Sequence, residues 1–323
     1  MEATLDAGMV SRAQGCLLGQ LCGDALGSLV EFSTPQEIRR LYPDGVRDLE
    51  DGGTWNTIAG QPTDDSELAL ALARTIVAQG RFDRLSVRAA YVEWIRSRPF
   101  DVGTTTSAGL AGEPKLHSES NGALMRISPL GIFGALQPLE RVAQWAREDA
   151  AITHPNPVCQ QASALFAMAV AHAIRYGCGP AELHERATEW AAQMDADERL
   201  RRVLERARVS PPRDYLSDQG WVLVALMNAF WQLLHAPSPE EAVVDTVMRG
   251  GDTDTNAAIC GALLGAVWGL DAVPPRWVQV VTNCRPEAGL PKVRRPRPAQ
   301  YWPCDALDLA ERLLRAGAAR TNP

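Results

Sequence analysis

Apolar residues recur at intervals of three and four along nearly the whole chain, which is the spacing of one face of an α-helix. Alternation of polar and apolar residues, which is typical of a half-buried strand, is poor throughout. The pattern predicts helices over the following stretches: Val10–Leu29, Glu67–Gln79, Arg84–Ser97, Pro138–Ala150, Val158–Tyr176, Pro180–Met194, Gln219–Leu234, Pro239–Met248, Asn256–Trp268 and Asp305–Ala316. We therefore expect an all-α protein of about a dozen helices of ordinary length.

Glycine occupies every fourth position in one stretch of the first predicted helix, at Gly15, Gly19, Gly23 and Gly27. Each glycine costs a helix about 1 kcal/mol relative to alanine, so four in register need a compensating contact. They form one flat stripe on which another backbone can pack closely. Asp24 lies among them, which favours a buried helix of a soluble protein over a membrane span.

The segments between predicted helices are expected to be loops: Thr54–Pro62, Arg98–Ser120, Pro211–Ser217 and the Pro-rich Arg285–Pro303. The Pro-rich segment is the best candidate for a domain boundary, but only one predicted helix, residues 305–316, follows it. We expect a single compact domain over residues 1–323, with the segment 285–303 and the last helix packed on it.

Charge and cysteine content narrow the class of protein. The chain has 323 residues and a formal net charge of −7, which argues against general binding to nucleic acid or to an anionic membrane. No run approaches the 18 or so uncharged apolar residues of a membrane span, and no signal peptide is recognised. Seven cysteines, an odd number without a C-x-x-C pair, favour a reducing compartment, so we expect a cytoplasmic protein.

Two acidic motifs stand directly before apolar helical runs. One is Thr63-Asp64-Asp65, and the other is Asp252-Thr253-Asp254-Thr255. Both predict the start of a helix, where threonine and aspartate side chains cap exposed backbone N–H groups. Capping explains one acidic residue at each helix start, and Asp64 with Glu67 has the spacing of a capping box. It does not explain paired carboxylates, which repel each other unless a cation lies between them.

Hard divalent cations resolve that repulsion, because Mg²⁺ and Mn²⁺ prefer carboxylate, hydroxyl and water oxygens in near-octahedral geometry. The two motifs together supply enough oxygen atoms for two ions about 3.5–4 Å apart. We therefore predict a two-metal cleft with these ligands: Thr63, Asp64, Asp65, Asp252, Asp254 and Thr255. Because the motifs lie near opposite ends of the chain, one shared site also requires one folded unit.

At these motifs the sequence resembles the ADP-ribosylglycohydrolase family, from about Gly15 to Leu270. The resemblance rests on ordered motifs: Gly15–Gly27 with Glu31, Thr63–Asp65, Pro99–Gly103, Ser120–Arg126, Thr153–Asn156 and Gly250–Asn256. It implies an all-helical fold with two Mg²⁺ or Mn²⁺ ions, ligated by the residues of the two acidic motifs. It also implies removal of ADP-ribose from a modified protein side chain, with free ADP-ribose as the product.

The resemblance further implies roles for six residues. Glu31 and Asp101 are similar to the acidic residues that approach the metals and the scissile bond. The residues expected to bind the ADP-ribose are Asn121, Gly122, Met125 and His154. Ala123 departs from the pattern, because many relatives have serine there, and no motif of the family is recognised after Arg285.

Simple chemistry agrees with these implied roles. Vicinal ribose hydroxyls can replace metal-bound water, and bound ions lower the pKa of a water molecule. A carboxylate such as Asp101 or Glu31 can carry a proton to the leaving group or from water. Backbone N–H groups of residues 120–123 can hold a diphosphate without a strongly basic surface.

Each site residue also has an ordinary structural explanation: Glu31 as a surface acid at a helix end, Asp101 and Asn121-Gly122 as turn residues, and His154 as a hydrogen-bonded loop residue. An isoprenoid synthase is a rival class. However, the Asp-rich motifs of such synthases lie within long helices, whereas the two acidic motifs of this chain stand at the start of predicted helices. A non-catalytic ADP-ribose-binding or structural protein on the same fold is the other alternative.

The glycosidic linkage stays open within the enzyme interpretation. The Pro99–Gly103 segment resembles the arginine-directed bacterial branch, so ADP-ribosyl-arginine is the favoured substrate. ADP-ribosyl-serine and small ADP-ribose conjugates are the alternatives. We expect a monomer that binds neither nucleic acid nor membrane. Among the scattered tryptophans, Trp55 is a candidate substrate contact.

Overall fold

The computed structural model describes residues 5–213 and 215–319, and over these residues the chain is built from helices and loops without a β-strand. The α-helices are α1 (Ala7–Gly27), α2 (Pro35–Leu41), α3 (Asp64–Gln79), α4 (Arg84–Arg96), α5 (Thr104–Ala111), α6 (Ser128–Phe133), α7 (Leu139–Ala150), α8 (Pro157–Tyr176), α9 (Pro180–Gln193), α10 (Glu198–Ala207), α11 (Val222–His235), α12 (Pro239–Met248), α13 (Thr253–Trp268), α14 (Pro275–Asn283) and α15 (Ala306–Ala318). Three 3-10 helices, η1 (Asn121–Ala123), η2 (Leu270–Ala272) and η3 (Ala299–Tyr301), complete the set. The predicted all-α class is confirmed.

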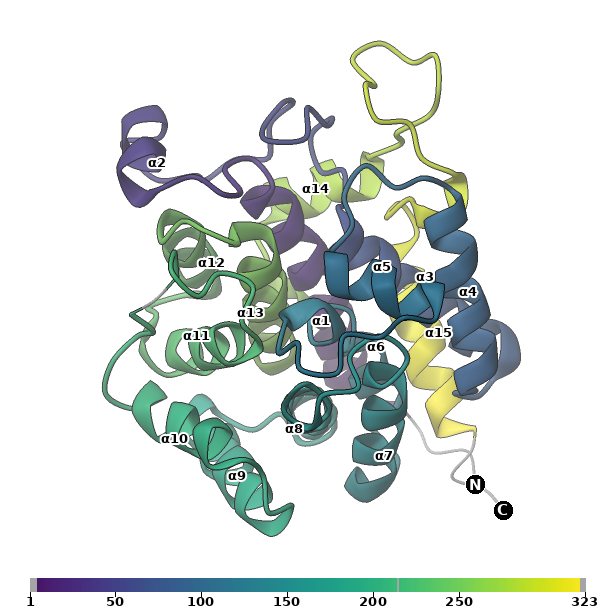
Figure 1. Cartoon of the computed structure of the whole chain (residues 1–323), viewed down its shortest axis with the longest axis vertical. Helices are drawn as coiled ribbons and strands as arrows, with labels where there is room; N and C mark the ends of the chain where they lie inside the picture. Colours follow the sequence, from purple (N-terminus) through teal and green to yellow (C-terminus); the bar gives the residue numbers. More distant parts are fainter. Residues whose placement is uncertain (1–4, 214, 320–323) are drawn as a thin grey trace.

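Helices α1 and α13 form the centre of the molecule, and the others surround them (Figure 1). The glycine stripe of α1 packs closely on another backbone, as the sequence predicts, and the structure shows that this backbone is α13. A Cβ atom on Gly19 would lie well inside van der Waals distance of the Gly261 carbonyl oxygen, and one on Gly23 would meet the Ala257 carbonyl. Gly261 faces Gly19 in the same way. The two backbones therefore approach so closely that only glycine fits at the crossing.

This close packing carries the start of α13 to the end of α1. The Thr253 hydroxyl donates a hydrogen bond of 2.7 Å to the Gly27 carbonyl, across 226 residues of sequence. A Cβ atom on Gly27 would overlap the backbone of Asp254. The second acidic motif is thus held against the helix that carries Asp24, which positions the candidate site.

Gly19→Ala is expected to lower the free energy of unfolding by about 2 kcal/mol, because the added methyl group would force two helix backbones apart. This penalty should exceed the gain of about 1 kcal/mol that alanine brings to a helix interior. Urea denaturation followed by circular dichroism measures the difference. Gly8→Ala in the same helix is the control, since its nearest neighbour is the flexible Arg12 guanidinium, and a loss there as large as at Gly19 would contradict the explanation.

Several helices were not predicted. Helix α5 lies inside the expected loop Arg98–Ser120, so that expectation was wrong for residues 104–111. Helices α2, α6, α10 and α14 were also missed. Three of these, and α5, are shorter than ten residues, which gives too few turns for a three-to-four periodicity to stand out. The expected loops 54–62 and 211–217 contain no helix among their described residues.

Helix α8 is long and apolar enough, by length and composition alone, to cross a membrane, which the sequence analysis did not expect. However, 78% of its apolar window is buried inside the protein, where α1, α6, α7 and α13 pack against it. Its apolar character is explained by burial in the core.

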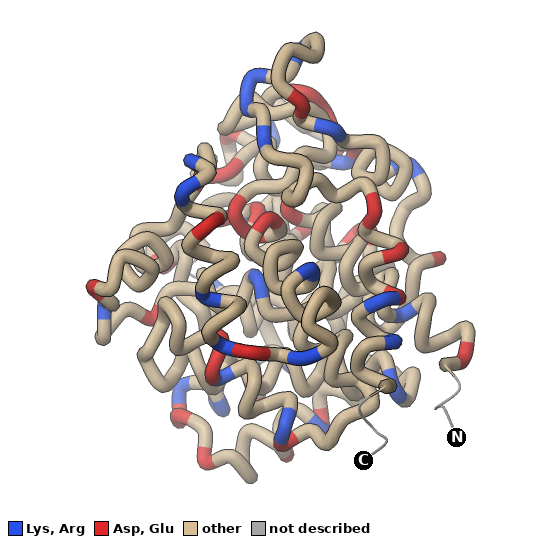
Figure 2. The backbone as a smooth tube through the Cα atoms, turned by 90° about the vertical axis from the view of Figure 1, so that its right-hand side faces the viewer, with Lys and Arg blue, Asp and Glu red and all other residues tan. Residues whose placement is uncertain are grey.

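In the view of Figure 2, acidic and basic positions are mixed along the backbone.

The chain after α14 returns to the body of the protein. Residues 285–303 form a loop that extends outward at the top right of Figure 1 and contains regular structure only at η3. Helix α15 then packs against α1, α3 and α6, and Arg74 pairs with Asp305 at 2.6 Å. The described residues form a single compact domain, whereas residues 1–4, 214 and 320–323 of the expected span lie outside them.

Candidate active site

A cavity of about 310 Å³ opens where the ends of α1, α3, α5 and α13 meet. All of the predicted site residues except Thr63 line it: Glu31, Asp64, Asp65, Asp101, Asn121, Gly122, Met125, His154, Asp252, Asp254 and Thr255. Thr63 is completely buried beside them. The fold therefore brings together residues that lie up to 224 positions apart in the printed sequence, while their roles stay predictions.

Both acidic motifs start helices as predicted, with Thr63 preceding α3 and Asp252 preceding α13. Neither side chain caps its own helix. The Thr63 hydroxyl instead contacts Asp24 at 2.9 Å and Asp65 at 3.1 Å. Asp252 accepts a hydrogen bond of 2.6 Å from the Asn121 amide. Helix capping, the ordinary explanation for one polar residue at each helix start, therefore does not account for Thr63 or Asp252.

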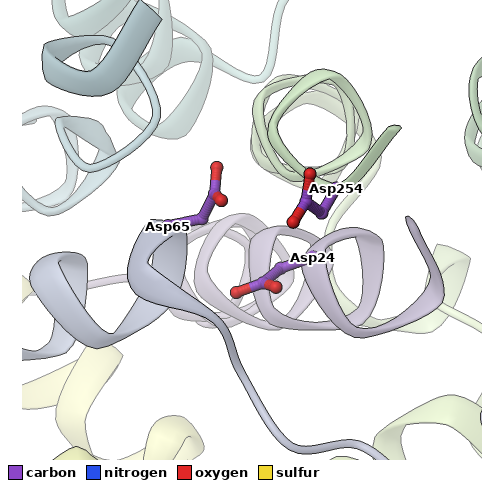
Figure 3. Close-up of side chains that lie close together, drawn as sticks. All are labelled: Asp24, Asp65 and Asp254. Atoms are coloured by element: carbon purple, nitrogen blue, oxygen red, sulfur yellow. The ribbon is translucent and has the colours of Figure 1, made fainter. Parts of the chain in front are cut away.

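Asp24, Asp65 and Asp254 place carboxylate oxygens within 4.8 Å of one another, each from a different helix (Figure 3). Asp65 Oδ1 and Asp254 Oδ2 are buried and accept no hydrogen bond from the described part of the chain. Buried polar atoms are nearly always paired, so two such oxygens in one cluster indicate a further partner. A hard divalent cation has the required charge and ligand preference.

A second group of carboxylates adjoins the first. Oxygens of Glu31, Asp101 and Asp254 also lie within 4.8 Å of one another. Asp254 belongs to both groups of carboxylates, so the two groups form one continuous acidic cluster. Asp101 and Asp64 share a hydrogen bond, and the Gly103 backbone N–H donates to Asp64 at 3.2 Å.

Burial raises the pKa of these carboxyl groups. It raises the pKa of Asp24 to about 7 and that of Glu31 to about 8, with the charge of Asp252 adding to the shift at Glu31. Burial and then the neighbouring Asp64 raise the pKa of Asp101 to about 11. The pKa of Asp254 also lies well above its usual range, mainly because of burial. The cluster therefore favours positive charge, in the form of protons or of a cation.

The 3-10 helix η1 lines the same cavity as these acidic residues and forms a tight loop. Its first residue, Asn121, donates from its backbone N–H to the Gly220 carbonyl at 2.9 Å. Gly122 is enclosed by Thr106 and His154, and a Cβ atom there would lie 2.9 Å from the Thr106 hydroxyl. Glycine is required here because the loop is pressed against these two side chains.

His154 is buried, with Nε2 2.9 Å from the Ser120 hydroxyl and Nδ1 2.7 Å from the Thr153 hydroxyl. Burial, assisted by the charge of Arg126, lowers the pKa of His154 to about 3. The imidazole is therefore neutral at pH 7, and it can orient a polar group but carries no charge for the diphosphate.

Three structural contributions to the site were not predicted from the sequence. Asp24 is buried and accepts hydrogen bonds from Thr63 and from the Ser66 backbone N–H, which fixes the start of α3. Arg126 forms a fully buried ion pair with Asp149 at 3.0 Å and donates to the Gly122 carbonyl at 3.3 Å. Asp24 and Arg126 both lie within the motifs of the family resemblance. The sequence around a single charged residue does not show which distant residue it will pair with.

The third contribution comes from the Pro-rich segment. Arg297 pairs with Glu67 of α3 at 2.7 Å, and both side chains are only 2% exposed. Glu67 also accepts from the Trp94 indole at 2.7 Å, so it takes no part in a capping box. The segment 285–303 is therefore bound by an ion pair to α3, the helix that begins at the first acidic motif.

Comparisons with known proteins agree with this geometry. The ADP-ribosylglycohydrolase family model matches residues 5–322. The chain is 31% identical over 278 residues to ADP-ribosyl-dinitrogen reductase glycohydrolase of Rhodospirillum rubrum, covering 83% of this chain and 89% of that protein. It is 29% identical to ADP-ribosylarginine hydrolase Tri1 of Pseudomonas putida, covering 84% and 74%, and 28% identical to human ADP-ribosylhydrolase ARH3, covering 84% and 89%.

A solved structure, titled ADP-ribosylglycohydrolase-related protein complex, matches with a TM-score of 0.78 at 27% identity, covering 96% of this chain and 99% of that one. The family model and the named relatives define the class of protein as a hydrolase. The chain belongs to the ADP-ribosylglycohydrolase family.

Proposed function

We propose that this protein is a metal-dependent ADP-ribosylhydrolase that releases ADP-ribose from ADP-ribosyl-arginine in a modified protein. The observation that carries the proposal is the pair of buried, unpartnered carboxylate oxygens of Asp65 and Asp254 inside a cleft that ends on a glycine loop. Family membership supports the reaction class.

The residues of the cleft would hold two divalent cations, Mg²⁺ or Mn²⁺, and Asp254 belongs to both groups of carboxylates. We propose these ligands: Thr63, Asp64, Asp65, Asp252, Asp254 and Thr255. When bound, the ions would supply positive charge that orients the ribose hydroxyls and lowers the pKa of water. Asp24 would not need to bind an ion, because its hydrogen bonds to Thr63 and Ser66 already hold the start of α3.

Asp101 and Glu31 are the proposed proton carriers. Both line the cleft beside Asp254, and the raised pKa of each lets it hold a proton near neutral pH. Asp101 shares a hydrogen bond with Asp64, which positions the carboxyl group that would carry the proton. Proton transfer by a positioned carboxyl group contributes about 10²–10⁴-fold to a rate.

The loop around η1 is proposed to bind the ADP-ribose. Asn121 and Gly122 line the cleft, Met125 contributes an apolar surface, and neutral His154 would orient a hydroxyl. Since the described cleft contains many acids, a diphosphate would depend on backbone N–H donors and on bound cations for charge balance. We further propose that the protein acts as a monomer in the cytoplasm; the seven free cysteines support the compartment only.

The test is to incubate the purified protein with arginine-linked and serine-linked ADP-ribosyl peptides, with Mg²⁺, with Mn²⁺ and with EDTA. Free ADP-ribose is followed by mass spectrometry. We expect release from the arginine-linked peptide in the presence of metal and its loss with EDTA. Faster release from the serine-linked peptide would replace the arginine assignment. No release from either by folded, metal-loaded protein would refute hydrolysis of protein conjugates and favour a small ADP-ribose conjugate or a binding role.

A further inference from the structure

Three aromatic side chains from distant parts of the sequence meet beside the cleft. The ring centroids of Phe32 and Trp55 lie 6.5 Å apart in an edge-to-face arrangement. Those of Trp55 and Phe100 lie 6.0 Å apart at 50°. We call Phe32, Trp55 and Phe100 the aromatic wall. It adjoins both candidate proton carriers, since the Trp55 indole contacts Glu31 and Phe32 lines the cleft together with Asp101.

Phe32 is held in an unfavourable conformation to present its ring. Its φ is +64°, in the left-handed region that bulky residues rarely adopt. The side chain is 57% exposed and lines the cleft, so burial of the ring does not compensate for the strain. The backbone N–H of Phe32 donates to the Gly251 carbonyl at 2.7 Å, which ties it to the loop before α13. Strain at a cleft wall is typical of a functional contact.

Trp55 is fixed from two sides. Its indole N–H donates to Glu31 Oε2 at 2.6 Å, so the ring and the carboxylate are positioned together. The guanidinium of Arg295 donates to the Trp55 carbonyl at 2.9 Å. Two residues further on, Arg297 donates to the Ser97 carbonyl at 3.0 Å, next to the turn that carries Phe100. The segment 285–303 therefore holds Trp55 directly and also holds the end of α4, three residues before Phe100.

The wall and the adjacent carboxylates match one type of ligand. Aromatic faces favour a planar cation, and a guanidinium stacks on aromatic rings while its N–H groups donate hydrogen bonds to carboxyl oxygens. A serine hydroxyl offers neither the plane nor the charge. The acidic residues also contact the glycine loop. Asp252 accepts a hydrogen bond from the Asn121 amide, and the next residue, Gly122, packs against His154.

We propose that the aromatic wall is the leaving-group subsite, and that the guanidinium of an ADP-ribosylated arginine stacks on Phe32 beside Glu31 and Asp101. This inference rests on the proposed hydrolysis of ADP-ribosyl-arginine. It assigns the choice of linkage to the wall and the binding of ADP-ribose to the loop around η1.

The experiment compares Phe32→Leu and Phe32→Tyr with the unaltered protein in its metal-loaded form. Leucine keeps apolar bulk without an aromatic face, and tyrosine keeps the face. The measurements are kcat and KM with an arginine-linked peptide, and the inhibition constant of ADP-ribose. Tyr176→Leu is the matched control, because Tyr176 is a comparably exposed aromatic residue, 61% exposed, at the far end of α8.

We expect Phe32→Leu to lower kcat/KM for the arginine-linked peptide by about 3–10-fold, the range of one exposed to partly desolvated cation–π contact. Phe32→Tyr should stay within about 2-fold of the unaltered protein, and the inhibition constant of ADP-ribose should not change in either variant. An unchanged kcat/KM in Phe32→Leu would overturn the subsite. A matching loss of ADP-ribose affinity would also overturn it, since the ring would then contact the nucleotide.

Failure of the underlying proposal gives a different result. If the unaltered protein releases nothing from the arginine-linked peptide but cleaves the serine-linked one, the arginine assignment and the subsite both fall. If the unaltered protein cleaves the arginine-linked peptide and Phe32→Leu cleaves it equally well, the proposed function stands and only the subsite is rejected.

Discussion

Asp254→Asn is expected to abolish most hydrolysis while it makes the metal-free protein more stable. Asp254 belongs to both carboxylate groups of the cleft, so its loss would remove a ligand from each. Charge stabilisation by bound ions contributes several kcal/mol to such reactions, which corresponds to a decrease in kcat of at least about 100-fold.

The gain in stability has a separate cause. Asp254 is buried, its Oδ2 has no hydrogen-bond partner in the described residues, and its pKa is raised by burial and by Glu31 and Asp65. An asparagine amide there could donate to those neighbouring carboxylates. We expect the free energy of unfolding in EDTA to rise by about 1–3 kcal/mol, the range for relieving an unsatisfied buried polar group.

Activity assays with Mn²⁺ and thermal unfolding in EDTA test both halves of this prediction. Asp271→Asn, an exposed acidic residue of η2, should change neither quantity. Full activity in Asp254→Asn would refute its place in the metal cleft. A loss of stability in EDTA would instead mean that Asp254 has a structural role in the metal-free fold.

Arg126→Met is expected to lower the free energy of unfolding by about 3–5 kcal/mol, because it leaves Asp149 charged and buried without its partner. The Arg126 guanidinium is fully buried and also donates to the Thr153 hydroxyl at 3.0 Å. The Tyr91 hydroxyl, 2.8 Å from Asp149, would be the remaining polar contact of that carboxylate.

The double variant Arg126→Met, Asp149→Leu should recover much of this loss, since an apolar pair of similar volume replaces the ion pair. Urea denaturation of the single and double variants measures the coupling. Arg186→Met, at a pair with both side chains about half exposed, should change stability by less than about 1 kcal/mol. Equal losses in the single and double variants would show that packing, not charge pairing, dominates at this site.

In the double variant, the KM for the ADP-ribosyl peptide measures how Arg126 affects the loop around η1. Arg126 contacts the Gly122 carbonyl, so its removal should raise KM for the ADP-ribosyl peptide even where the fold is restored. An unchanged KM would show that η1 is held by its other contacts, such as that of the Asn121 N–H with Gly220.

The local pattern of the sequence was sufficient for features that depend on neighbouring residues. The starts of α3 and α13 were predicted because Thr63 and Asp252 precede long apolar periods. The stripe from Gly15 to Gly27 predicted a close backbone contact, because glycine within a helix needs such a reason. The paired aspartates predicted a cationic partner from repulsion alone.

Only the tertiary structure decided which distant residues meet. Asp24 joined the acidic cluster through the packing of α1 against α3 and α13, and nothing near it in sequence indicates those partners. Arg297 met Glu67 across 230 residues, which bound the Pro-rich segment to α3. The physical reason is that periodicity and capping act over a few residues, whereas charge pairs and aromatic contacts depend on how the helices close around α1 and α13.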